Sequence, residues 1–275
     1  MILVLGATGN VGRELVGQLS ERGQRVRAVV RRDDADLPAG VEALRGDLGD
    51  TDSLAPALAG ARAMFMLSGY PDRSELLQHG REAGLEHVVL LSASSAVNGT
   101  PENAVARYHM DSEADVRESG LGWTVLRPNS FFSNALRWRS QLANGDTVRL
   151  PFADVAVAAN DPLDVAAVAA EALAHPDMHH EKTYRLSGPK PLLPGEQVEI
   201  LGRALGRPLE FEAQDDESAR AEMSESMPPE YVEAFFAFFR GGELDESKVH
   251  ATVRDVTGRE PRTFADWASA HADLF

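Results

Sequence analysis

The sequence predicts an α/β fold: a doubly wound parallel sheet followed by a smaller C-terminal α+β lobe. Short apolar segments alternate with amphipathic helical segments through the first half of the chain. This alternation is typical of a parallel sheet covered by helices on both faces. The first apolar segment leads directly into a glycine-rich turn and an apolar helical stripe, as such sheets commonly begin. The second half is less regular, so we assign it to a separate lobe.

The elements of the first half follow from apolar periodicity and from glycines that end helical stretches. Strands are predicted at residues 2–5, 25–30, 41–44, 63–67, 87–91 and 123–126. Helices are predicted at residues 10–22, 51–58, 73–83 and 102–119. Together they form a first domain over residues 1–150, in which right-handed crossovers give the doubly wound order.

In the second half, strands are predicted at residues 155–158, 183–186 and 209–211, and helices at 164–174, 194–205 and 228–240. Asp164 is placed near the N-cap of the first of these helices. The lobe spans residues 151–275 and supplies the substrate wall, and a segment of about 151–190 is expected to return to the large sheet. Four phenylalanines in the last helix cannot share one face, so they divide between the core and a pocket or interface.

Composition narrows the classes of function. The net charge of −16 repels nucleic-acid phosphates and anionic lipid, so neither nucleic acid nor a membrane is predicted as a partner. The chain has no cysteine, which excludes disulfides, thiolate chemistry and cysteine-based zinc sites. Its apolar runs are too short to cross a bilayer and no basic segment precedes the first strand, so a cytoplasmic location is expected. His175, His179 and His180 are interpreted as surface residues, and no metal site is predicted.

The turn after the first strand has the glycine spacing of a phosphate-binding loop. Gly6 allows a tight turn, Gly9 lets the backbone approach a phosphate, and Gly12 lets the helix pack against the strand. The helix N-terminus presents unpaired N–H groups and a positive dipole end to an anion. We therefore predict a Rossmann-type dinucleotide site at Gly6, Thr8, Gly9, Asn10, Val11 and Gly12. The alternative is a structural turn that binds nothing.

The end of the second strand indicates which dinucleotide binds. Arg31 and Arg32 stand where NAD-binding proteins usually carry an acidic residue. Arginine would hold a ribose 2′-phosphate by charge-assisted hydrogen bonds, so NADP(H) is the predicted cofactor. Asp33 and Asp34 follow and are expected to face solvent. The alternative is that both arginines are solvated surface residues.

Further cofactor contacts are predicted where other strands end, because the carboxyl ends of parallel strands line the crevice. These residues are Asp47, Leu48, Leu67, Ser68, Gly69, Ser92, Asn129, Ser130 and Phe131. Asp47 and Leu48 are expected either at the adenine edge or in a turn before the next helix. Ser92 is expected at the nicotinamide ribose or the substrate carbonyl, and Tyr70 over the nicotinamide. Polar loop residues without a function are the alternative for Ser92.

An ordered set of motifs resembles the NmrA-like atypical short-chain dehydrogenase/reductases over nearly the whole chain. The motifs are Gly6-Ala7-Thr8-Gly9-Asn10-Val11-Gly12, Val29-Val30-Arg31, Gly46-Asp47-Leu48, Ser119 to Pro128, Asp164-Val165-Ala166 and Tyr184 to Pro189. Within the group, the chain is similar to the quinone and triphenylmethane-dye reductase branch. The resemblance implies a monomer or homodimer that binds NADP(H) and transfers hydride to conjugated, often aromatic, acceptors.

The chain departs from most short-chain reductases because it lacks their Tyr-x-x-x-Lys pair. Tyr108 is followed four residues later by Ser112, and the first lysine in the chain is Lys182. His109 falls where related reductases have a lysine or a histidine, so it is the first catalytic candidate, ahead of Ser92 and Tyr70. The alternative is a structural histidine bonded to the backbone. Tyr108 is predicted to point about 100° round the helix from it, away from the same pocket.

These features predict an NADPH-dependent reductase that acts on a quinone-like or other conjugated small molecule. Two alternatives remain open. The first is a non-catalytic redox sensor that binds NADP(H). The second is an isomerase, dehydratase or epimerase that uses the cofactor transiently or structurally.

Overall fold

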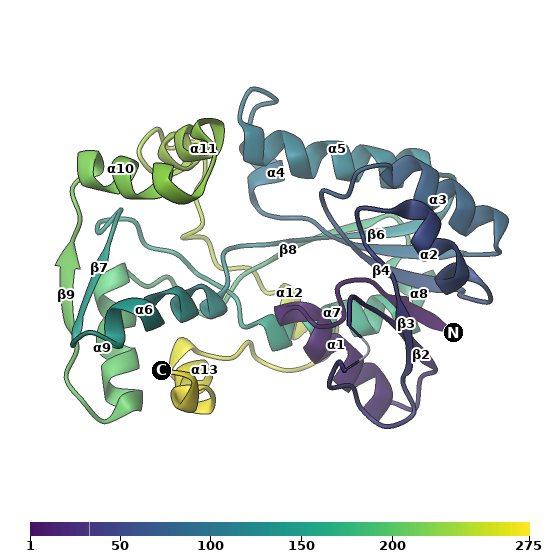
Figure 1. Cartoon of the computed structure of the whole chain (residues 1–275), viewed down its shortest axis with the longest axis horizontal. Coiled ribbons are helices and arrows are strands. Elements are labelled where there is room, and N and C mark those ends of the chain that lie inside the picture. The colour runs from purple at the N-terminus through teal and green to yellow at the C-terminus, as the bar shows by residue number, and fades with distance from the viewer. Residues whose placement is uncertain (33) are drawn as a thin grey trace.

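A computed structural model describes residues 1–32 and 34–275, and Figure 1 shows a large lobe and a small lobe. The large lobe is built on a seven-stranded sheet with the order β3-β2-β1-β4-β5-β6-β8. Every recorded strand pair in this sheet is parallel. The strands are β1 (Ile2–Val4), β2 (Val26–Val30), β3 (Glu42–Arg45), β4 (Ala63–Leu67), β5 (His87–Leu91), β6 (Gly122–Pro128) and β8 (Lys182–Leu186). The predicted doubly wound α/β fold is confirmed.

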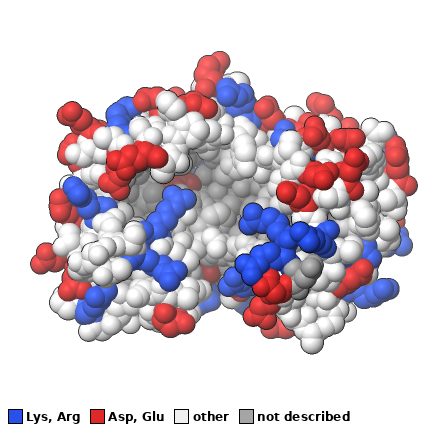
Figure 2. Space-filling view, in the orientation of Figure 1, with Lys and Arg blue, Asp and Glu red and all other residues white. Residues whose placement is uncertain are grey.

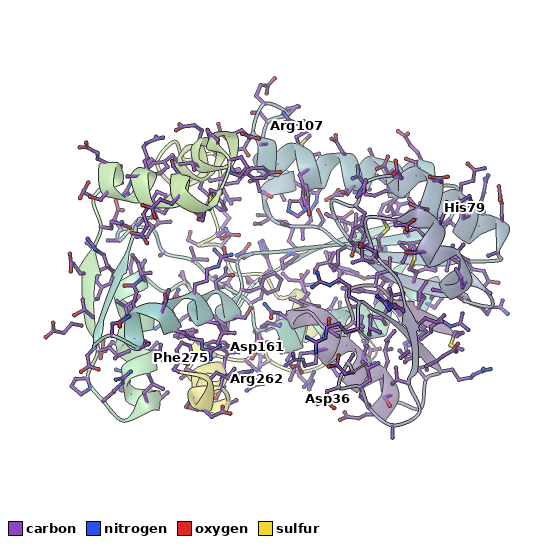
Figure 3. All side chains as sticks on the ribbon, viewed as in Figure 1. Asp36, His79, Arg107, Asp161, Arg262 and Phe275 are labelled. Atoms are coloured by element: carbon purple, nitrogen blue, oxygen red, sulfur yellow. The ribbon has the colours of Figure 1, made fainter. Side chains whose placement is uncertain are left out.

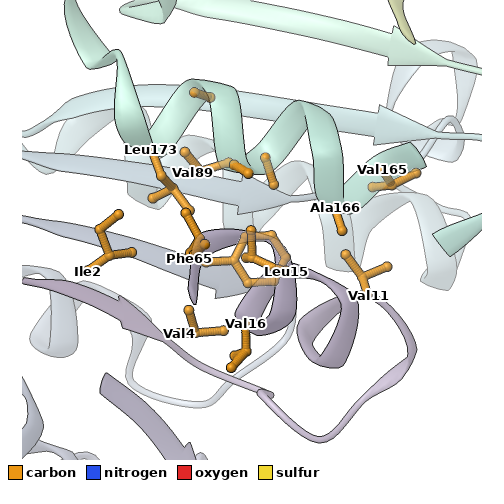
Figure 4. Packing of buried hydrophobic residues seen from close by; sticks show 14 of the residues in the cluster. Ile2, Val4, Val11, Leu15, Val16, Phe65, Val89, Val165, Ala166 and Leu173 are labelled. Atoms are coloured by element: carbon orange, nitrogen blue, oxygen red, sulfur yellow. The ribbon is translucent and has the colours of Figure 1, made fainter. Parts of the chain in front are cut away.

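Helices cover both faces of the sheet because alternate strand residues point to opposite sides. Val4 and Phe65 enter one core, under α1 (Asn10–Glu21), α7 (Pro162–Ala174) and α12 (Thr252–Thr257) (Figure 4). Leu3 and Met64 enter the other core, under α2 (Thr51–Leu58), α3 (Arg73–Glu82) and α5 (Ala104–Glu118). In both cores, the strand residues come from the apolar segments that were predicted to form buried strands.

The small lobe contains a separate two-stranded parallel sheet in which β7 pairs with β9. Its elements are η1 (Phe132–Trp138), α6 (Arg139–Leu142), β7 (Thr147–Leu150), α9 (Pro194–Leu205), β9 (Glu210–Ala213), α10 (Asp216–Ser226), α11 (Pro229–Phe239) and α13 (Phe264–Ala270). Trp138, Leu201 and Trp267 belong to its main apolar core. The remaining short elements are α4 (Ser95–Asn98), α8 (Pro176–His179) and η2 (Ala272–Leu274).

Several sequence predictions differ from this arrangement. The predicted boundary at residue 150 falls inside the small lobe, since the chain leaves the large sheet after β6 and β7 pairs with β9. The strand predicted at 155–158 is wrong: this stretch makes only an isolated bridge between Val157 and Leu192. Helix α7 begins at Pro162 and is capped by Asp161, whose carboxylate accepts from the Leu163 N–H at 2.9 Å.

Asp164, predicted near that N-cap, is instead buried under the C-terminal segment. Its carboxylate accepts the backbone N–H of Arg262 at 2.7 Å, and the Arg262 guanidinium lies 3.4 Å from Asp161. Figure 3 shows Asp161 and Arg262 side by side. Burial raises the pKa of Asp164 from 3.8 to about 6 against the opposing hydrogen bond from Arg262. The large lobe and the C-terminal segment therefore meet at a carboxyl group that is costly to ionise.

A close approach holds α1 against the loop that precedes it. A Cβ placed on Gly12 would lie 2.1 Å from the carbonyl oxygen of Gly6. Gly17, in the same helix, has no described atom within 4 Å of the corresponding position. A side chain at Gly12 would therefore clash with the preceding loop, whereas a side chain at Gly17 would not.

We expect Gly12→Ala to destabilise the protein by at least about 2 kcal/mol, because the helix or loop must move to admit the methyl group. Gly17→Ala is the matched control and should stabilise the protein by about 0.5–1 kcal/mol, since it only reduces backbone freedom in a helix. Urea denaturation measures both free energies of unfolding. Effects of the same sign at the two positions would contradict the assignment of Gly12 to a packing contact.

The raised pKa of Asp164 predicts a pH dependence of stability. A carboxyl group with a raised folded-state pKa stabilises the fold below its unfolded pKa, and this contribution is lost as pH rises through about 6. Between pH 4 and pH 8, we expect the free energy of unfolding to fall less for Asp164→Asn than for the wild type. The difference between the two falls should be up to about 3 kcal/mol. The exposed Asp111→Asn is the control. Parallel pH curves for the wild type and Asp164→Asn would refute this role of Asp164.

Candidate functional site

The turn from β1 to α1 has the geometry of a phosphate loop. Gly6 has a φ of +66°, in the left-handed region, and α1 begins after Gly9 without a side-chain cap. Thr8, Gly9 and Asn10 are exposed, whereas Val11 turns its side chain into the core and so offers only backbone to a ligand. The uncapped N–H groups and positive dipole end of α1 therefore adjoin an exposed turn.

The loop leaves room for an anion close to its backbone. A Cβ on Gly9 would meet only the Gly6 carbonyl oxygen, at 3.2 Å, among the described atoms. The Asn10 side-chain amide donates to the Ser133 hydroxyl of η1 at 3.0 Å, which ties the loop to the small lobe. The residues present thus fit the pyrophosphate of a dinucleotide.

Arg31 and Arg32 are both exposed at the carboxyl end of β2. Arg32 donates to both carboxylate oxygens of Asp34, at 2.9 and 2.5 Å, and this hydrogen bonding lowers the pKa of Asp34. The prediction for Asp33 lies outside the described residues. Arg31 therefore stands beside an arginine that is already paired with a carboxylate.

Asp47 and Leu48 form a turn between β3 and α2. The Asp47 carboxylate accepts the Gly49 N–H at 2.9 Å, and Leu48 packs against the core on the α2 face. These contacts account for the turn that was one of the two interpretations. A contact with adenine stays a prediction.

The loop after β4 is closed by Tyr108. Gly69 has a φ of +90°, and a Cβ there would lie within 2.0 Å of the Tyr108 ring. The Tyr108 hydroxyl donates to the Ser68 carbonyl at 2.8 Å, and the Ser68 hydroxyl donates to the Leu91 carbonyl at 3.0 Å. Leu67 packs against the core on the α1 face. This loop is thus held by contacts within the protein.

Tyr70 packs against the core on the face covered by α2, α3 and α5. Its hydroxyl is buried and has no hydrogen-bond partner among the described residues. Burial, followed by the neighbouring Tyr108, raises the pKa of Tyr70. Tyr70 therefore keeps its proton at physiological pH, and its predicted place over the nicotinamide stays a prediction.

Ser92 belongs to a buried ionic network that joins α5 to the sheet. Its hydroxyl donates to Glu113 at 2.7 Å, and the Arg127 guanidinium donates to both Glu113 oxygens at 2.7 and 2.6 Å. Burial would raise the pKa of Glu113, but hydrogen bonds from Arg127, Ser92 and Arg117 outweigh it and lower the pKa. The Ser92 hydroxyl thus donates its hydrogen bond to an ionised carboxylate.

His109 lies one helical turn before Glu113. Its Nδ1 is buried and has no hydrogen-bond partner among the described residues. Burial lowers the pKa of His109 to about 4, although the nearby Glu113 opposes the shift. The ring is therefore neutral at physiological pH, so it can orient a ligand by hydrogen bonding but does not begin as an imidazolium acid.

The relation between His109 and Tyr108 differs from the prediction. The two rings lie 4.9 Å apart between centroids in an edge-to-face arrangement, so the expectation that they point apart is wrong. Tyr108 reaches the loop after β4, and the His109 ring lies against the Tyr108 ring. Sequence spacing gives the direction of the Cα–Cβ bond, and not where a long side chain ends.

The residues after β6 meet a carboxylate that sequence reasoning missed. Glu246 is 5% exposed and accepts from the Ser94 hydroxyl at 2.6 Å and from the Ser130 N–H and hydroxyl at 2.9 and 2.6 Å. The Asn129 amide donates to the Glu246 carbonyl at 3.0 Å, and Phe131 packs against the core on the α1 face. Burial raises the pKa of Glu246. No pattern in its irregular segment could have identified it.

The small lobe holds a cavity of about 410 Å³. Its lining includes Arg137 of η1 and Arg149 of β7, together with apolar side chains such as Met223 and Phe235. Figure 2 shows a hollow between the two lobes, with Lys and Arg side chains gathered over η1 and α6 beside it. Arg137 and Trp138 of η1 line this cavity, and Ser133 of the same element is bonded to Asn10 of the dinucleotide loop.

Two other classes of site receive no support from residues 1–32 and 34–275. No helix in these ranges is long and apolar enough to cross a membrane. No group of three or more His, Cys, Asp or Glu side chains there is arranged to hold a metal ion.

Comparison with known proteins gives consistent matches. A model of the NAD(P)H-binding family matches residues 6–176. The chain is 38% identical to (4-alkanoyl-5-oxo-2,5-dihydrofuran-3-yl)methyl phosphate reductase of Streptomyces griseus, over 100% of this chain and 99% of the relative. It is 34% identical to NAD(P)H azoreductase of Xenophilus azovorans, with the same coverage of 100% and 99%.

The fold has solved counterparts as well. Triphenylmethane reductase of Citrobacter sp., solved in complex with NADP(H), superposes with a TM-score of 0.79 at 21% identity, over 99% of this chain and 100% of that one. The resemblance drawn from the motifs is confirmed. The chain belongs to the NAD(P)H-binding family.

Proposed function

We propose that this protein is an NADPH-dependent reductase of conjugated small molecules, with quinone-like and enone-like acceptors as its substrate class. One observation carries the proposal: Asn10 of the dinucleotide loop is bonded to Ser133 of η1, and η1 continues into the lining of the small-lobe cavity. A cofactor and an acceptor bound at these two places would be neighbours. Holding two reactants side by side supplies much of the rate enhancement in such a reaction.

The residues around the crevice support hydride transfer without strong acid catalysis. His109 is neutral at physiological pH, and the Tyr108 hydroxyl donates a hydrogen bond to a backbone carbonyl. NADPH held at the glycine loop would supply a hydride, and one proton from solvent would complete the reduction of one double bond of the acceptor, with NADP⁺ as the other product. A conjugated acceptor takes up the electron pair in its own π system, so this chain's residues need only orient it.

The names of the relatives agree with this substrate class. The 5-oxo-2,5-dihydrofuran ring named for the Streptomyces griseus relative contains a carbon–carbon double bond beside a carbonyl group. The Xenophilus azovorans relative is named for reduction of azo compounds. Both are conjugated acceptors, and neither name restricts the present chain to quinones.

The proposal is tested by NADPH oxidation with a panel of quinones, azo dyes and the dihydrofuranone phosphate ester. We expect turnover with at least one class, and a loss of about tenfold or more in kcat for His109→Ala with little change in the dissociation constant of NADPH. Because the pKa of His109 is about 4, the wild-type rate should not titrate with this group between pH 6 and pH 8.

The same experiment separates the reductase from the sensor, which the neutral His109 and the missing lysine also favour. NADPH that binds tightly yet is never consumed across the panel would overturn the reductase and favour the sensor. Turnover of a substrate without net formation of NADP⁺ would instead favour the isomerase, dehydratase or epimerase.

Arg31 supports NADPH over NADH as the cofactor. We expect Arg31→Ala to raise the dissociation constant of NADPH by about tenfold or more and to leave that of NADH unchanged, since only NADPH carries the 2′-phosphate. Fluorescence titration measures both constants. Arg25→Ala, an exposed arginine just before β2 begins, is the matched control. Equal losses for NADPH and NADH in Arg31→Ala would count against the predicted contact.

A further inference from the structure

We propose that Arg137 and Arg149 form an anion subsite in the small-lobe cavity that holds a phosphate group of the substrate. This inference rests on the proposed function, since it names one part of the acceptor that the reductase would bind. The acceptor then has three parts: a conjugated centre near the cofactor, a phosphate at the arginines, and an apolar group against the apolar lining of the cavity.

The two arginines are brought together by a clamp between α6 and β7. The Gln141 side chain accepts the Arg149 N–H at 2.8 Å and donates to the Arg149 carbonyl at 3.2 Å. Arg137 lies in the last turn of η1, directly before α6, and both arginines line the same cavity. The clamp therefore fixes the backbone from which Arg149 projects beside the helix that carries Arg137.

The charges of these two arginines are not taken up by a close carboxylate. Four other small-lobe arginines are paired with carboxylates: Arg203 with Glu199, Arg207 with Asp146, Arg220 with Glu233, and Arg240 with Asp154 and Asp216. Arg139 of α6 has no ion pair among the described residues either, but it does not line the cavity. Arg149 has a carboxylate only at 4.0 Å, that of Glu212. For Arg137, the residues that the structure describes offer no ion pair. In a chain with 43 acidic and 27 basic residues, two such arginines in one cavity favour an anionic ligand.

The cavity also contains one acid and one apolar wall. Glu222 lines it, and the Gln214 side-chain amide donates to the Glu222 carboxylate at 2.8 Å. Met223, Met227 and Phe235 supply apolar lining near it. A ligand that satisfies both sides is amphiphilic, with a phosphate for the guanidinium groups and a hydrocarbon group for the methionines.

The distance along η1 suits a small molecule. Ser133, which accepts from Asn10 of the dinucleotide loop, lies four residues before Arg137 in this 3₁₀ helix. At about 2 Å per residue, the two positions are about 8 Å apart along the helix axis. A phosphate held at Arg137 would therefore leave the conjugated part of the same molecule near the loop.

Binding without turnover tests the subsite. Calorimetry on the NADP⁺ complex compares the dihydrofuranone phosphate ester with its free alcohol, because NADP⁺ cannot reduce either. We expect the ester to bind about tenfold or more tightly than the alcohol, with the difference shrinking as salt rises. Arg137→Gln and Arg149→Gln should each remove most of this difference and leave the affinity for the alcohol unchanged, and Arg137→Lys should retain part of it.

Arg139→Gln is the matched control, because Arg139 lies in α6 beside Arg137 and does not line the cavity. Equal affinities for ester and alcohol, or an equal loss in Arg139→Gln and Arg137→Gln, would overturn the subsite. An ester that binds as expected but is not reduced with NADPH supports the subsite and refutes the proposed function. Reduction of both compounds with equal kcat/KM supports the function and refutes the subsite.

Discussion

The buried carboxyl group of Glu246 is the contact on which the arrangement of the two lobes depends. A buried carboxylate needs hydrogen bonds to offset its lost hydration, and here every recorded donor to it is on the large lobe, at Ser94 and Ser130. The Glu246 backbone is held as well, because its carbonyl accepts from Asn129 and from the Ala158 N–H. These bonds fix the segment after α11 against the residues that follow β5 and β6.

This attachment explains how the cavity and the dinucleotide loop come to face one crevice. The Asn10–Ser133 bond closes the contact on the side of α1, and Glu246 closes it at the ends of β5 and β6. Between these two anchors runs η1, which carries Ser133 at one end and Arg137 at the other. Under the proposed function, η1 would orient an acceptor by its charged end, and the neutral His109 would act by orientation as well.

Local signals predicted the parts of the structure whose conformation is set locally. The glycine spacing predicted the turn at Gly6, and apolar runs bounded by turn residues predicted β4, β5 and α9 with their observed bounds. The predictions failed where contacts with distant segments determine the local conformation or the hydrogen-bond partners. Residues 155–158 read as a strand but find no strand partner, and Glu246 has no local pattern because its donors are more than a hundred residues away. Ser92 was correctly placed at a strand end, but its hydroxyl is taken up by Glu113 from another element.

Tyr108 has a structural contact where many short-chain reductases have a tyrosine paired with a lysine. In most of these enzymes a lysine lowers the pKa of a tyrosine so that the phenol can exchange a proton, whereas burial raises the pKa of Tyr108. The Tyr108 ring packs where a Cβ of Gly69 would be, and its hydroxyl donates to the Ser68 carbonyl. Tyr108 thus stabilises the left-handed turn after β4 and serves structure in place of proton transfer. In the proposed reductase, the acceptor would carry its own electron sink, and groups in the small lobe would supply selectivity by binding the rest of the molecule.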